Sequence, residues 1–385
     1  AASLRQEKYP GPITILGDEA QAPYQRPPLS KQYLSGELST DQVLVRPEKF
    51  YTDREIALHT NTTVASIDAD DKKVTTESGD VYEYEKLLIA TGSSPRRLNI
   101  PGSDLAGIHY LRTIDDVDRI RNAMSTAKSL CIIGGGYVGL EVAAVAVTAG
   151  LDVTLLEMEE RILQRVTTPE MSAYYHNLHS NRGVNIMLST AVSGFEGEGS
   201  VSAVLCGDKT FDADLVIVGI GIIPNIDIAE AAGLECNNGI LVDDHCLTSN
   251  ADIYSAGDCT NHPNPILGRR LRLESVPNAI EQARVAVSNM LGGDKTYACV
   301  PWFWSDQYEL KLQMVGFSAD GDKSVVRGEK SANKFAVFYL NDGKVVAVDA
   351  VNSPKEFMIG KRLYGKPVDP AKLADASVEL KSLLG

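Results

Sequence analysis

The chain has 385 residues, of which 44% are hydrophobic and 23% charged, and its formal net charge at pH 7 is −14. This length accommodates two or three domains with their own cores, and the composition is ordinary for a globular protein. The acidic balance argues against broad nucleic-acid binding. The sequence contains no run of about 18 apolar residues, so it predicts no membrane-spanning helix. We expect a cytoplasmic protein, because its scattered cysteines are typical of reduced thiols in that compartment.

The first residues, AASLRQEKYPGPITILGDE, contain no initial methionine. Residues 1–9 predict the end of an amphipathic helix, residues 10–12 end it, and residues 13–16 predict a short buried strand that leads to Asp18. A helix followed by a strand that ends in an acid is the second half of a nucleotide-binding βαβ unit. The first strand and its glycine loop are absent, so we expect the chain to be incomplete at its N-terminus.

Two early segments are candidate contacts to a cofactor. PYQRPPLSK contains Arg26 and Lys31, and a rigid proline segment places a cation against a phosphate or against a flavin. A solvent-exposed proline loop is the alternative interpretation. The apolar strand that begins at residue 81 ends at Thr91-Gly92, where glycine allows the backbone to approach a ligand closely. Further along, Thr113 followed by two aspartates predicts a capped helix.

The clearest nucleotide motif is GGGYVG, which places Gly134, Gly136 and Gly139 in G-x-G-x-x-G spacing between a strand and a helix. These glycines permit a tight turn, the approach of the backbone to a pyrophosphate and close packing of the helix. The next strand ends in Glu157, which is typical of an acid that binds the adenosine ribose and repels a 2′-phosphate. The sequence therefore predicts NADH rather than NADPH as the substrate.

Glu141 follows the last glycine of this loop in the first helical turn. A glutamate at this position reaches toward the nicotinamide end of the cofactor. An acid that only stabilises the helix dipole is an equally good interpretation of the sequence.

Beyond the nucleotide unit, YSAGDC places Asp258 at the end of a strand of small residues, where a carboxylate binds the hydroxyls of a polyol such as the ribityl chain of a flavin. A helix follows, and from Trp302 the composition becomes β-rich, with helical segments from Pro354. Alternation along WFWSDQ places Trp302 and Trp304 on one face, either as a core cluster or as an aromatic wall near a cofactor.

Six cysteines are scattered along the sequence, beginning at Cys131. None forms a C-x-x-C pair, and none has the spacing of metal ligands. We expect reduced thiols and no metal site. A thiol mechanism like that of the disulfide reductases is disfavoured, because the early segment RPPLSKQYLSG contains no cysteine.

Taken together, the quoted segments resemble the FAD-dependent NADH:ferredoxin reductases, the family that includes putidaredoxin reductase and the reductases of aromatic-ring dioxygenase and bacterial cytochrome P450 systems. The segments that carry the resemblance occur in the family's order: PYQRPPLSK, ATGSSPRRL, YLRT, IIGGGYVGLEVA, VGIGIIPN, YSAGDC and WFWSDQ. The resemblance covers the whole chain except its start.

The resemblance implies an α/β fold of the glutathione-reductase type. Two Rossmann-like dinucleotide-binding domains, for FAD and NAD, precede a C-terminal α+β domain. The NAD-binding domain, residues 111–224, is inserted into the FAD-binding domain, residues 1–110 and 225–301, and residues 302–385 form the C-terminal reductase domain.

The resemblance also implies roles for particular residues. Asp18 corresponds to the acid on the FAD adenosine ribose, Lys31 to the lysine beside the isoalloxazine, and Asp258 to the ribityl aspartate. The further FAD contacts that it implies are Arg26, Val64, Ala90, Thr91, Gly92, Arg112, Gly257, Ser275, Val276 and Trp304. The NADH contacts are Gly134, Gly136, Tyr137, Val138, Gly139, Glu141, Glu157, Gly219 and Glu274. Lys31, Glu141 and Trp304 are the residues expected to act in catalysis.

The implied reaction is hydride transfer from NADH to FAD, followed by transfer of single electrons to a small acidic [2Fe–2S] ferredoxin that feeds an oxygenase. A rubredoxin reductase or an apoptosis-inducing-factor-like NADH oxidoreductase remains an alternative, and a redox-sensing binding protein is the non-enzymatic alternative. We expect a monomer or weak dimer. Because the chain is itself acidic, docking of an acidic ferredoxin requires a local basic patch, or else these residues form a solvated loop. The candidates for the patch are Arg96, Arg97, Arg269, Arg270, Arg272 and Lys311.

Overall fold

The computed structural model describes residues 1–384, which form two compact units. The first unit contains residues 1–25, 41–94 and 223–301, and the second contains residues 26–40, 95–222 and 302–384. None of the helices in this described part of the chain has both the length and the apolar character needed to cross a bilayer. The division into three domains stays a prediction.

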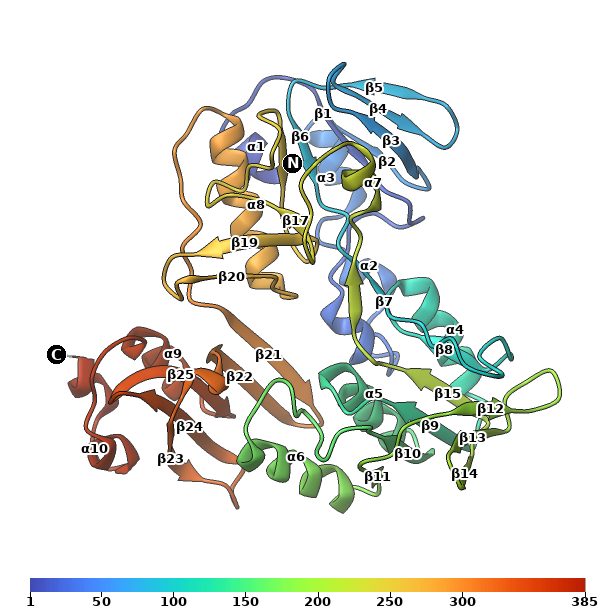
Figure 1. Cartoon of the computed structure of the whole chain (residues 1–385), viewed down its shortest axis with the longest axis vertical. Helices are drawn as coiled ribbons and strands as arrows, with labels where there is room; N and C mark the ends of the chain where they lie inside the picture. Colours follow the sequence, from blue (N-terminus) through green and yellow to red (C-terminus); the bar gives the residue numbers. More distant parts are fainter. Residues whose placement is uncertain (385) are drawn as a thin grey trace. The chain divides into compact units, whose positions relative to one another are not determined.

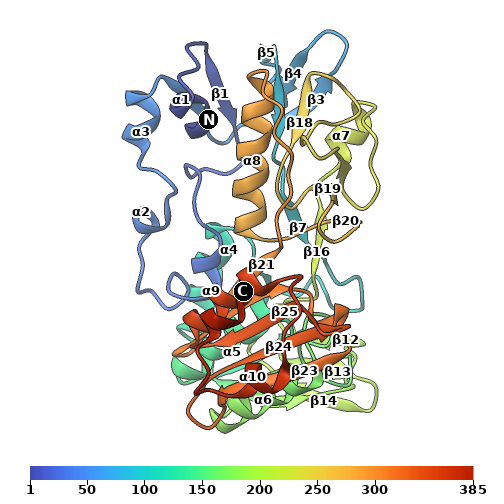
Figure 2. The same cartoon turned by 90° about the vertical axis from the view of Figure 1, so that its left-hand side faces the viewer.

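The first unit is built from small sheets around the helix α8, Val276–Met290. Strand β1, Ile13–Leu16, pairs in parallel with β2, Ile56–His59, and β6, Leu87–Ile89, pairs in parallel with β18, Ile253–Ser255. Helix α8 packs against β18 (Figure 2). The remaining helices and strands are α1 (Ala2–Gln6), α3 (Glu48–Asp53), β3 (Val64–Asp68), β4 (Lys73–Thr76), β5 (Val81–Glu83), α7 (Asp227–Ala231), β17 (Ile240–Leu241), β19 (Thr260–Asn264) and β20 (Arg269–Leu271). Three further elements, α2 (Thr40–Val43), β7 (Ser93–Pro95) and β16 (Ile222–Pro224), each extend by one residue into the residue ranges of the second unit.

The strand predicted at residues 13–16 is therefore confirmed at the predicted position. The preceding helix α1 ends earlier than expected, at Gln6. Lys8 adopts a left-handed backbone conformation with φ of 62°, which a continuing right-handed helix does not allow.

A five-stranded parallel sheet in the order β11-β10-β9-β15-β8 forms the first layer of the second unit (Figure 1). Its inner strands β9 and β15 are almost continuously apolar, as expected for parallel strands that are buried on both faces. The elements of this part are β8 (Ile108–Tyr110), α4 (Ile114–Met124), β9 (Ser129–Ile133), α5 (Tyr137–Thr148), β10 (Asp152–Leu156), α6 (Pro169–Asn181), β11 (Asn185–Met187), β12 (Gly194–Glu196), β13 (Ala203–Cys206), β14 (Lys209–Asp212) and β15 (Leu215–Val218). The strand–loop–helix–strand unit predicted around GGGYVG is confirmed as β9, α5 and β10.

Helix α4 begins where the sequence predicts. The Thr113 side chain accepts a hydrogen bond from the Asp116 N–H, and the Asp116 side chain accepts one from the Thr113 N–H. This capping box satisfies two backbone donors at the N-terminus of the helix.

Residues 302–384 add an antiparallel five-stranded sheet in the order β21-β22-β25-β24-β23 (Figure 1). Helix α9, Pro354–Leu363, packs on strands β22 and β25, and α5 of the parallel layer packs on β21. The strands are β21 (Trp302–Gln307), β22 (Leu310–Gly316), β23 (Lys323–Glu329), β24 (Lys334–Asn341) and β25 (Lys344–Val351), and α10 spans Pro370–Ala374. The second unit also contains three short 3₁₀ turns, η1 (Pro27–Ser30), η2 (Ser318–Asp320) and η3 (Leu380–Leu384).

Candidate functional site

The glycine loop between β9 and α5 has no room for side chains at two of its three motif positions. A Cβ atom at Gly139 would lie 2.1 Å from the Gly134 carbonyl oxygen, and one at Gly134, where φ is +108°, would lie 2.3 Å from that of Gly219. Gly136 differs, because nothing lies within 4 Å of its Cβ position. It is the N-cap of α5 and provides no side-chain cap. The loop therefore leaves open space at a helix N-terminus, which fits the pyrophosphate of a dinucleotide.

Glu157 follows β10 and lies beside this loop. Its Oε2 accepts a hydrogen bond of 2.7 Å from the Gly135 N–H, and its Oε1 accepts one of 2.9 Å from the Glu159 N–H. Each carboxylate oxygen retains a further lone pair for a ligand hydroxyl. The structure thus brings the predicted ribose acid and the predicted pyrophosphate loop together.

The side chains of Val138 and Tyr137, two other predicted NADH contacts on α5, lie in different surroundings. Val138 is 43% exposed in the first turn, as an apolar contact to a nucleotide requires. The Tyr137 hydroxyl instead donates to Met314 Sδ at 2.8 Å, and its ring lies 5.2 Å from that of Phe303. The Tyr137 side chain therefore packs toward the C-terminal sheet, and only its backbone remains at the glycine loop.

A buried ion pair joins Lys31 to Glu141. The Lys31 Nζ lies 2.8 Å from Glu141 Oε2, and the two side chains are 10% and 4% exposed. The hydroxyl of Ser30 donates to the same carboxylate oxygen at 2.5 Å, and that of Ser305 donates to Oε1 at 2.6 Å. Three segments far apart in the sequence therefore meet at one carboxylate.

Burial raises the pKa of Glu141, and Lys31 and the two serine hydroxyls oppose that rise. A buried charge without such partners would neutralise. Ser30 and Ser305 are functional candidates that sequence reasoning missed, because no spacing pattern links a serine at either position to Glu141.

The remaining FAD candidates of the second unit, Arg26, Arg112 and Trp304, lie on three segments. Arg26 Nη1 donates to the Arg112 carbonyl at 2.8 Å, and the Arg112 N–H donates to Asp116 Oδ2 at 3.1 Å. In β21 the indole rings of Trp302 and Trp304 lie 5.7 Å apart, which confirms that they share a face.

In the first unit, the predicted ribityl aspartate lies at a tightly held strand end. Gly257 has a φ of +91°, and its N–H donates to Gln282 Oε1 on α8 at 2.8 Å. Asp258 Oδ2 accepts a hydrogen bond of 3.2 Å from the Ser93 hydroxyl. This carboxylate and hydroxyl at a buried strand end fit the hydroxyls of a flavin's polyol chain.

The other FAD candidates of this unit lie at the ends of strands and at the start of α8. Thr91 Oγ1 donates to the Asn225 carbonyl at 2.6 Å, which fixes the loop of Ala90, Thr91 and Gly92. Asp18 is exposed after β1, and Val64 begins β3. Ser275 is the N-cap of α8, and Val276 is 37% exposed beside it. Glu274, a predicted NADH contact, pairs with Arg272 at 2.6 Å.

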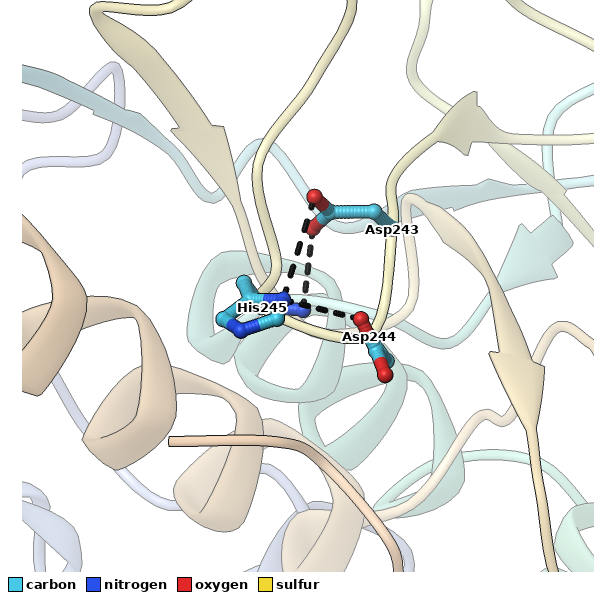
Figure 3. Close-up of side chains that lie close together, drawn as sticks. All are labelled: Asp243, Asp244 and His245. Carbon is cyan, nitrogen blue, oxygen red and sulfur yellow. Dashed lines mark hydrogen bonds and ion pairs between the residues drawn. The ribbon is translucent and has the colours of Figure 1, made fainter. Parts of the chain in front are cut away.

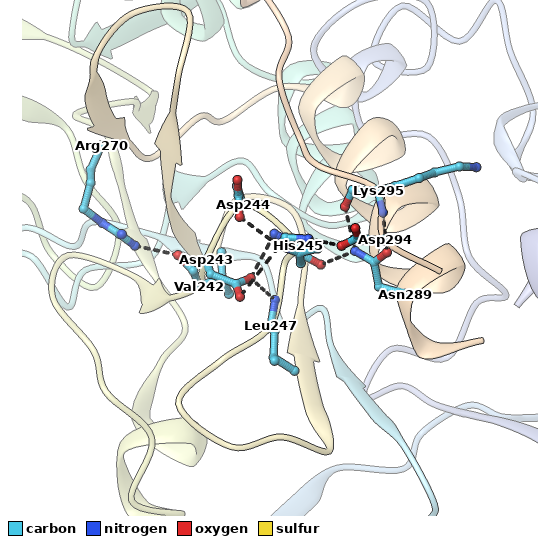
Figure 4. A network of polar contacts seen from close by, with 9 residues as sticks. All are labelled: Val242, Asp243, Asp244, His245, Leu247, Arg270, Asn289, Asp294 and Lys295. Atoms are coloured by element: carbon cyan, nitrogen blue, oxygen red, sulfur yellow. Dashed lines mark hydrogen bonds and ion pairs between the residues drawn. The ribbon is translucent and has the colours of Figure 1, made fainter. Parts of the chain in front are cut away.

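One titratable cluster was not anticipated from the sequence. Asp243, Asp244 and His245 are close enough to offer ligand atoms to one ion (Figure 3). The structure gives these groups internal partners, since His245 Nδ1 and Nε2 lie 2.8 Å from oxygens of Asp244 and Asp294. Asp243 Oδ1 accepts the N–H groups of His245 and Leu247 (Figure 4). The hydrogen bond to Asp294, and then that to Asp244, raise the pKa of His245, and the Asp294 contact connects the His245 loop to the segment after α8.

Asp349, on β25, is a second buried carboxylate of the second unit. Its Oδ2 accepts hydrogen bonds of 2.8 Å from Thr167 and 2.9 Å from Tyr339. Burial raises the pKa of Asp349 to about 6, against the effect of these two donors. Thr167 lies in the segment that joins Glu157 to α6. The Asp349 carboxylate therefore connects the C-terminal sheet to the segment that follows the predicted ribose acid.

We expect Asp349→Asn to stabilise the protein at neutral pH. A carboxyl whose folded pKa lies above its unfolded value of 3.8 destabilises the folded state progressively as the pH rises from about 4 to about 6, and this cost persists above pH 6. The variant should therefore gain roughly 1–3 kcal/mol in unfolding free energy at pH 7.5 and nothing near pH 4. Urea unfolding at both pH values measures the difference. A gain that is equal at the two pH values would contradict this explanation.

Comparison with known proteins shows which families the chain matches. Residues 1–283 match the family described as pyridine nucleotide-disulphide oxidoreductase, and residues 302–384 match the one described as reductase C-terminal. Putidaredoxin reductase of Pseudomonas putida is 42% identical over 100% of this chain and 93% of its own length.

Two solved structures also resemble the chain. The ferredoxin reductase for the CYP199A2 system of Rhodopseudomonas palustris has a TM-score of 0.96 and 40% identity, covering 100% of this chain and 96% of the other. Putidaredoxin reductase in its covalent complex with putidaredoxin has a TM-score of 0.95 and 42% identity, covering 100% and 94%.

Proposed function

We propose a function from the premise that this chain belongs to the pyridine nucleotide-disulphide oxidoreductase family and carries a reductase C-terminal domain. The proposed function is that of an FAD-dependent NADH:ferredoxin reductase. The observation that carries this proposal is the buried Lys31–Glu141 pair, one turn into the helix that leaves the dinucleotide loop. FAD, when bound, accepts a hydride from NADH and releases electrons one at a time.

The chain's own residues bind and orient the two cofactors. The backbone around Gly136 and the N-terminus of α5 hold the NADH pyrophosphate, and Glu157 holds its adenosine ribose. Glu141 lies at the nicotinamide end, where a fixed negative charge stabilises the positive charge that develops as the hydride leaves. Lys31 supplies the positive charge that stabilises the reduced flavin. Asp258 binds the ribityl hydroxyls, and Asp18 binds the adenosine ribose of FAD.

Disulfide chemistry does not enter this function. None of the six cysteines, all of which lie in the described part of the chain, forms a disulfide, and four of them, Cys131, Cys206, Cys246 and Cys259, are buried. Burial raises the pKa of Cys246 to about 12 and that of Cys236 to about 11, so both are thiols at neutral pH. A thiol of this kind is a poor nucleophile toward a disulfide.

The proposed function is tested on the purified holoprotein. The bound cofactor is extracted and identified as FAD, and NADH-dependent reduction of ferricyanide and of a [2Fe–2S] ferredoxin is measured. We expect both acceptors to be reduced. Absence of flavin, or NADH oxidation that reduces ferricyanide but no ferredoxin or rubredoxin, would overturn the proposal, and reduction of rubredoxin alone would favour a rubredoxin reductase.

Glu157→Gln tests the nucleotide preference. The amide loses the negative charge that binds two ribose hydroxyls and repels a 2′-phosphate, but it keeps one acceptor for the Gly135 N–H. We expect the ratio of kcat/KM for NADH over NADPH to fall about tenfold, as the loss of one charged hydrogen bond implies. Steady-state rates with both nucleotides measure it. Equal kcat/KM for NADH and NADPH in the unmodified protein would contradict the proposed role of Glu157 in selecting NADH.

Among the predicted docking residues, Arg270 and Arg272 are poor positions for a charge-reversal test, because both have partners within their own unit. Arg270 donates to the carbonyl oxygen of Val242 (Figure 4) and to that of Asn261, and Arg272 pairs with Glu274. Substitution of these two internally bonded arginines would perturb the fold as well as the surface charge. Lys311 lies 3.7 Å from Asp306 and is 57% exposed, so its charge stays accessible.

We expect Arg269→Glu to raise the ferredoxin KM about threefold to tenfold at low salt and to flatten its salt dependence. The rate with ferricyanide should stay unchanged, because a small acceptor needs no docking surface. Lys209→Glu, at another exposed basic residue, serves as the matched control. Identical ferredoxin kinetics in the Arg269 and Lys209 variants would exclude Arg269 from the interface.

A further inference from the structure

A continuous chain of buried polar side chains runs from Glu141 to helix α6 within the second unit. The Ser305 hydroxyl lies 2.6 Å from Glu141 Oε1, and Gln307 Nε2 lies 3.1 Å from that hydroxyl. Gln307 Oε1 lies 2.8 Å from His179 Nε2, and the Tyr308 hydroxyl lies 3.1 Å from His179 Nδ1. Ser305, Gln307 and His179 are each at most 1% exposed. No step of the proposed function uses these three residues.

The carboxylate at one end determines the direction of every hydrogen bond in this chain. An ionised Glu141 only accepts, so the Ser305 hydroxyl donates to it and accepts from the Gln307 amide N–H. The Gln307 carbonyl then accepts, which requires the proton of His179 to be on Nε2. His179 Nδ1 therefore accepts from the Tyr308 hydroxyl. All four donors point toward Glu141, and each of Ser305, Gln307 and His179 both donates and accepts one of these hydrogen bonds.

The charges around the chain agree with this arrangement. Glu141 faces Lys31 and Ser30 from the η1 segment and Ser305 from β21, while Tyr137 lies one turn earlier on its own helix. His179 faces Arg182 and His176 on its own helix and Gln307 and Tyr308 of the C-terminal sheet, with Glu309 near Tyr308. Burial lowers the pKa of His179 to about 4, so its ring is neutral near pH 7 and takes one defined tautomer.

The chain orients Glu141 and does not conduct protons. A primary amide neither gives up nor takes up a proton readily at neutral pH, so Gln307 interrupts proton transfer between His179 and Ser305. Aligned donors instead polarise one another and strengthen the last hydrogen bond, the one that reaches the carboxylate.

We infer that Ser305, Gln307 and His179 are positioning residues that keep Glu141 ionised and aimed at Lys31. They act on the reaction only through that carboxylate. The kinetic consequence rests on the proposed function, whereas the protonation state of Glu141 and the tautomer of His179 do not. The C-terminal sheet would thereby contribute directly to the charge at the NADH site.

The test compares Ser305→Ala with Ser305→Thr, which retains the hydroxyl, and with Ser353→Ala, which removes another buried serine of the C-terminal segment. Infrared spectra of the holoproteins across pH report the band of the protonated carboxyl that is absent in Glu141→Gln. Loss of one hydrogen bond to a charged group should shift the Glu141 protonation equilibrium about tenfold toward the neutral acid in Ser305→Ala. The Thr variant and the Ser353 control should behave like the unmodified protein.

Kinetics and nitrogen NMR complete the test. With NADH and ferricyanide, Ser305→Ala should lower kcat about tenfold with little change in the KM for NADH, and Ser305→Thr should restore it. In the unmodified protein, ¹⁵N NMR of His179 should show a neutral ring with its proton on Nε2.

A proton on Nδ1 of His179, or an unchanged Glu141 band in Ser305→Ala, would overturn the inference even if the protein is an active reductase. If the unmodified protein does not oxidise NADH, the proposed function fails while the infrared and NMR results still decide the inference. Since the NMR measurement needs no variant, failure of Ser305→Ala to fold leaves the inference testable.

Discussion

Lys31→Met should lower the unfolding free energy by about 3–5 kcal/mol near neutral pH, because it leaves the Glu141 carboxylate buried without its cation. Only the hydroxyls of Ser30 and Ser305 would remain as partners. The rate of NADH-dependent ferricyanide reduction should fall at least tenfold, since the site loses the positive charge that the proposed function assigns to the reduced flavin. Urea unfolding at pH 4.5 and pH 8 and steady-state rates measure the two effects.

The pH dependence of this loss has a definite sign. Lys31 opposes the rise in the pKa of Glu141, so its removal raises that pKa further. A raised pKa makes the folded state lose stability as the pH rises above the unfolded value of 4.5, so the deficit of the variant should be larger at pH 8 than at pH 4.5. A deficit that does not change with pH would indicate that the loss comes from packing of the lysine stem.

The double variant Lys31→Met/Glu141→Gln is the matched control. It removes both charges and keeps the shape of the acid, so most of the stability should return, whereas the lost activity should not. If the double variant is as unstable as the single one, the buried charge is not the cause of the instability.

The second large effect is expected at the glycine loop, where two alanine substitutions should behave in opposite ways. Gly139→Ala places a Cβ 2.1 Å from a backbone oxygen that cannot rotate away, so the loop or the helix must shift. We expect a loss of about 1–3 kcal/mol or more in stability together with at least a hundredfold rise in the KM for NADH. Gly136→Ala meets no atom within 4 Å and has an ordinary φ of −80°, so the fold should be unchanged within about 0.5 kcal/mol.

Gly136→Ala should nevertheless weaken the binding of NADH, because the alanine methyl group occupies the space assigned to the pyrophosphate. We expect the KM for NADH to rise about tenfold, a loss of about 1.4 kcal/mol in binding. Isothermal titration with NADH and urea unfolding of both variants measure these effects. If NADH binds the Gly136 variant as tightly as the unmodified protein, the pyrophosphate lies elsewhere.

Sequence reasoning was most successful where the interacting residues lie within one βαβ unit. The strand, glycine loop, helix and terminal acid around Gly134 and Glu157 occupy a short stretch, and local backbone geometry requires glycine at the close approaches. The capping box of Thr113 and Asp116 is predictable for the same reason, since its partners are three residues apart. The end of α1 was predicted too late because the left-handed residue Lys8 carries no sequence signal for that conformation.

Contacts between segments that are far apart in the sequence could not be predicted from the sequence. Glu141 was equally compatible with a helix-dipole role until the fold placed Lys31, Ser30 and Ser305 around it. Arg270 and Arg272 belong to a basic cluster in the sequence, yet hydrogen bonds and an ion pair inside their own unit occupy both.

The sequence by itself therefore determined the family, the dinucleotide loop and the absence of an early redox cysteine, because each depends on residue type and short spacing. The tertiary structure alone decided that Glu141 is a buried carboxylate with a cation on one oxygen and an aligned chain of donors on the other. The physical reason is that burial and charge pairing are properties of a three-dimensional neighbourhood. Around Glu141, three elements form that neighbourhood: a proline-rich turn, the helix after the glycine loop and a strand of the C-terminal sheet.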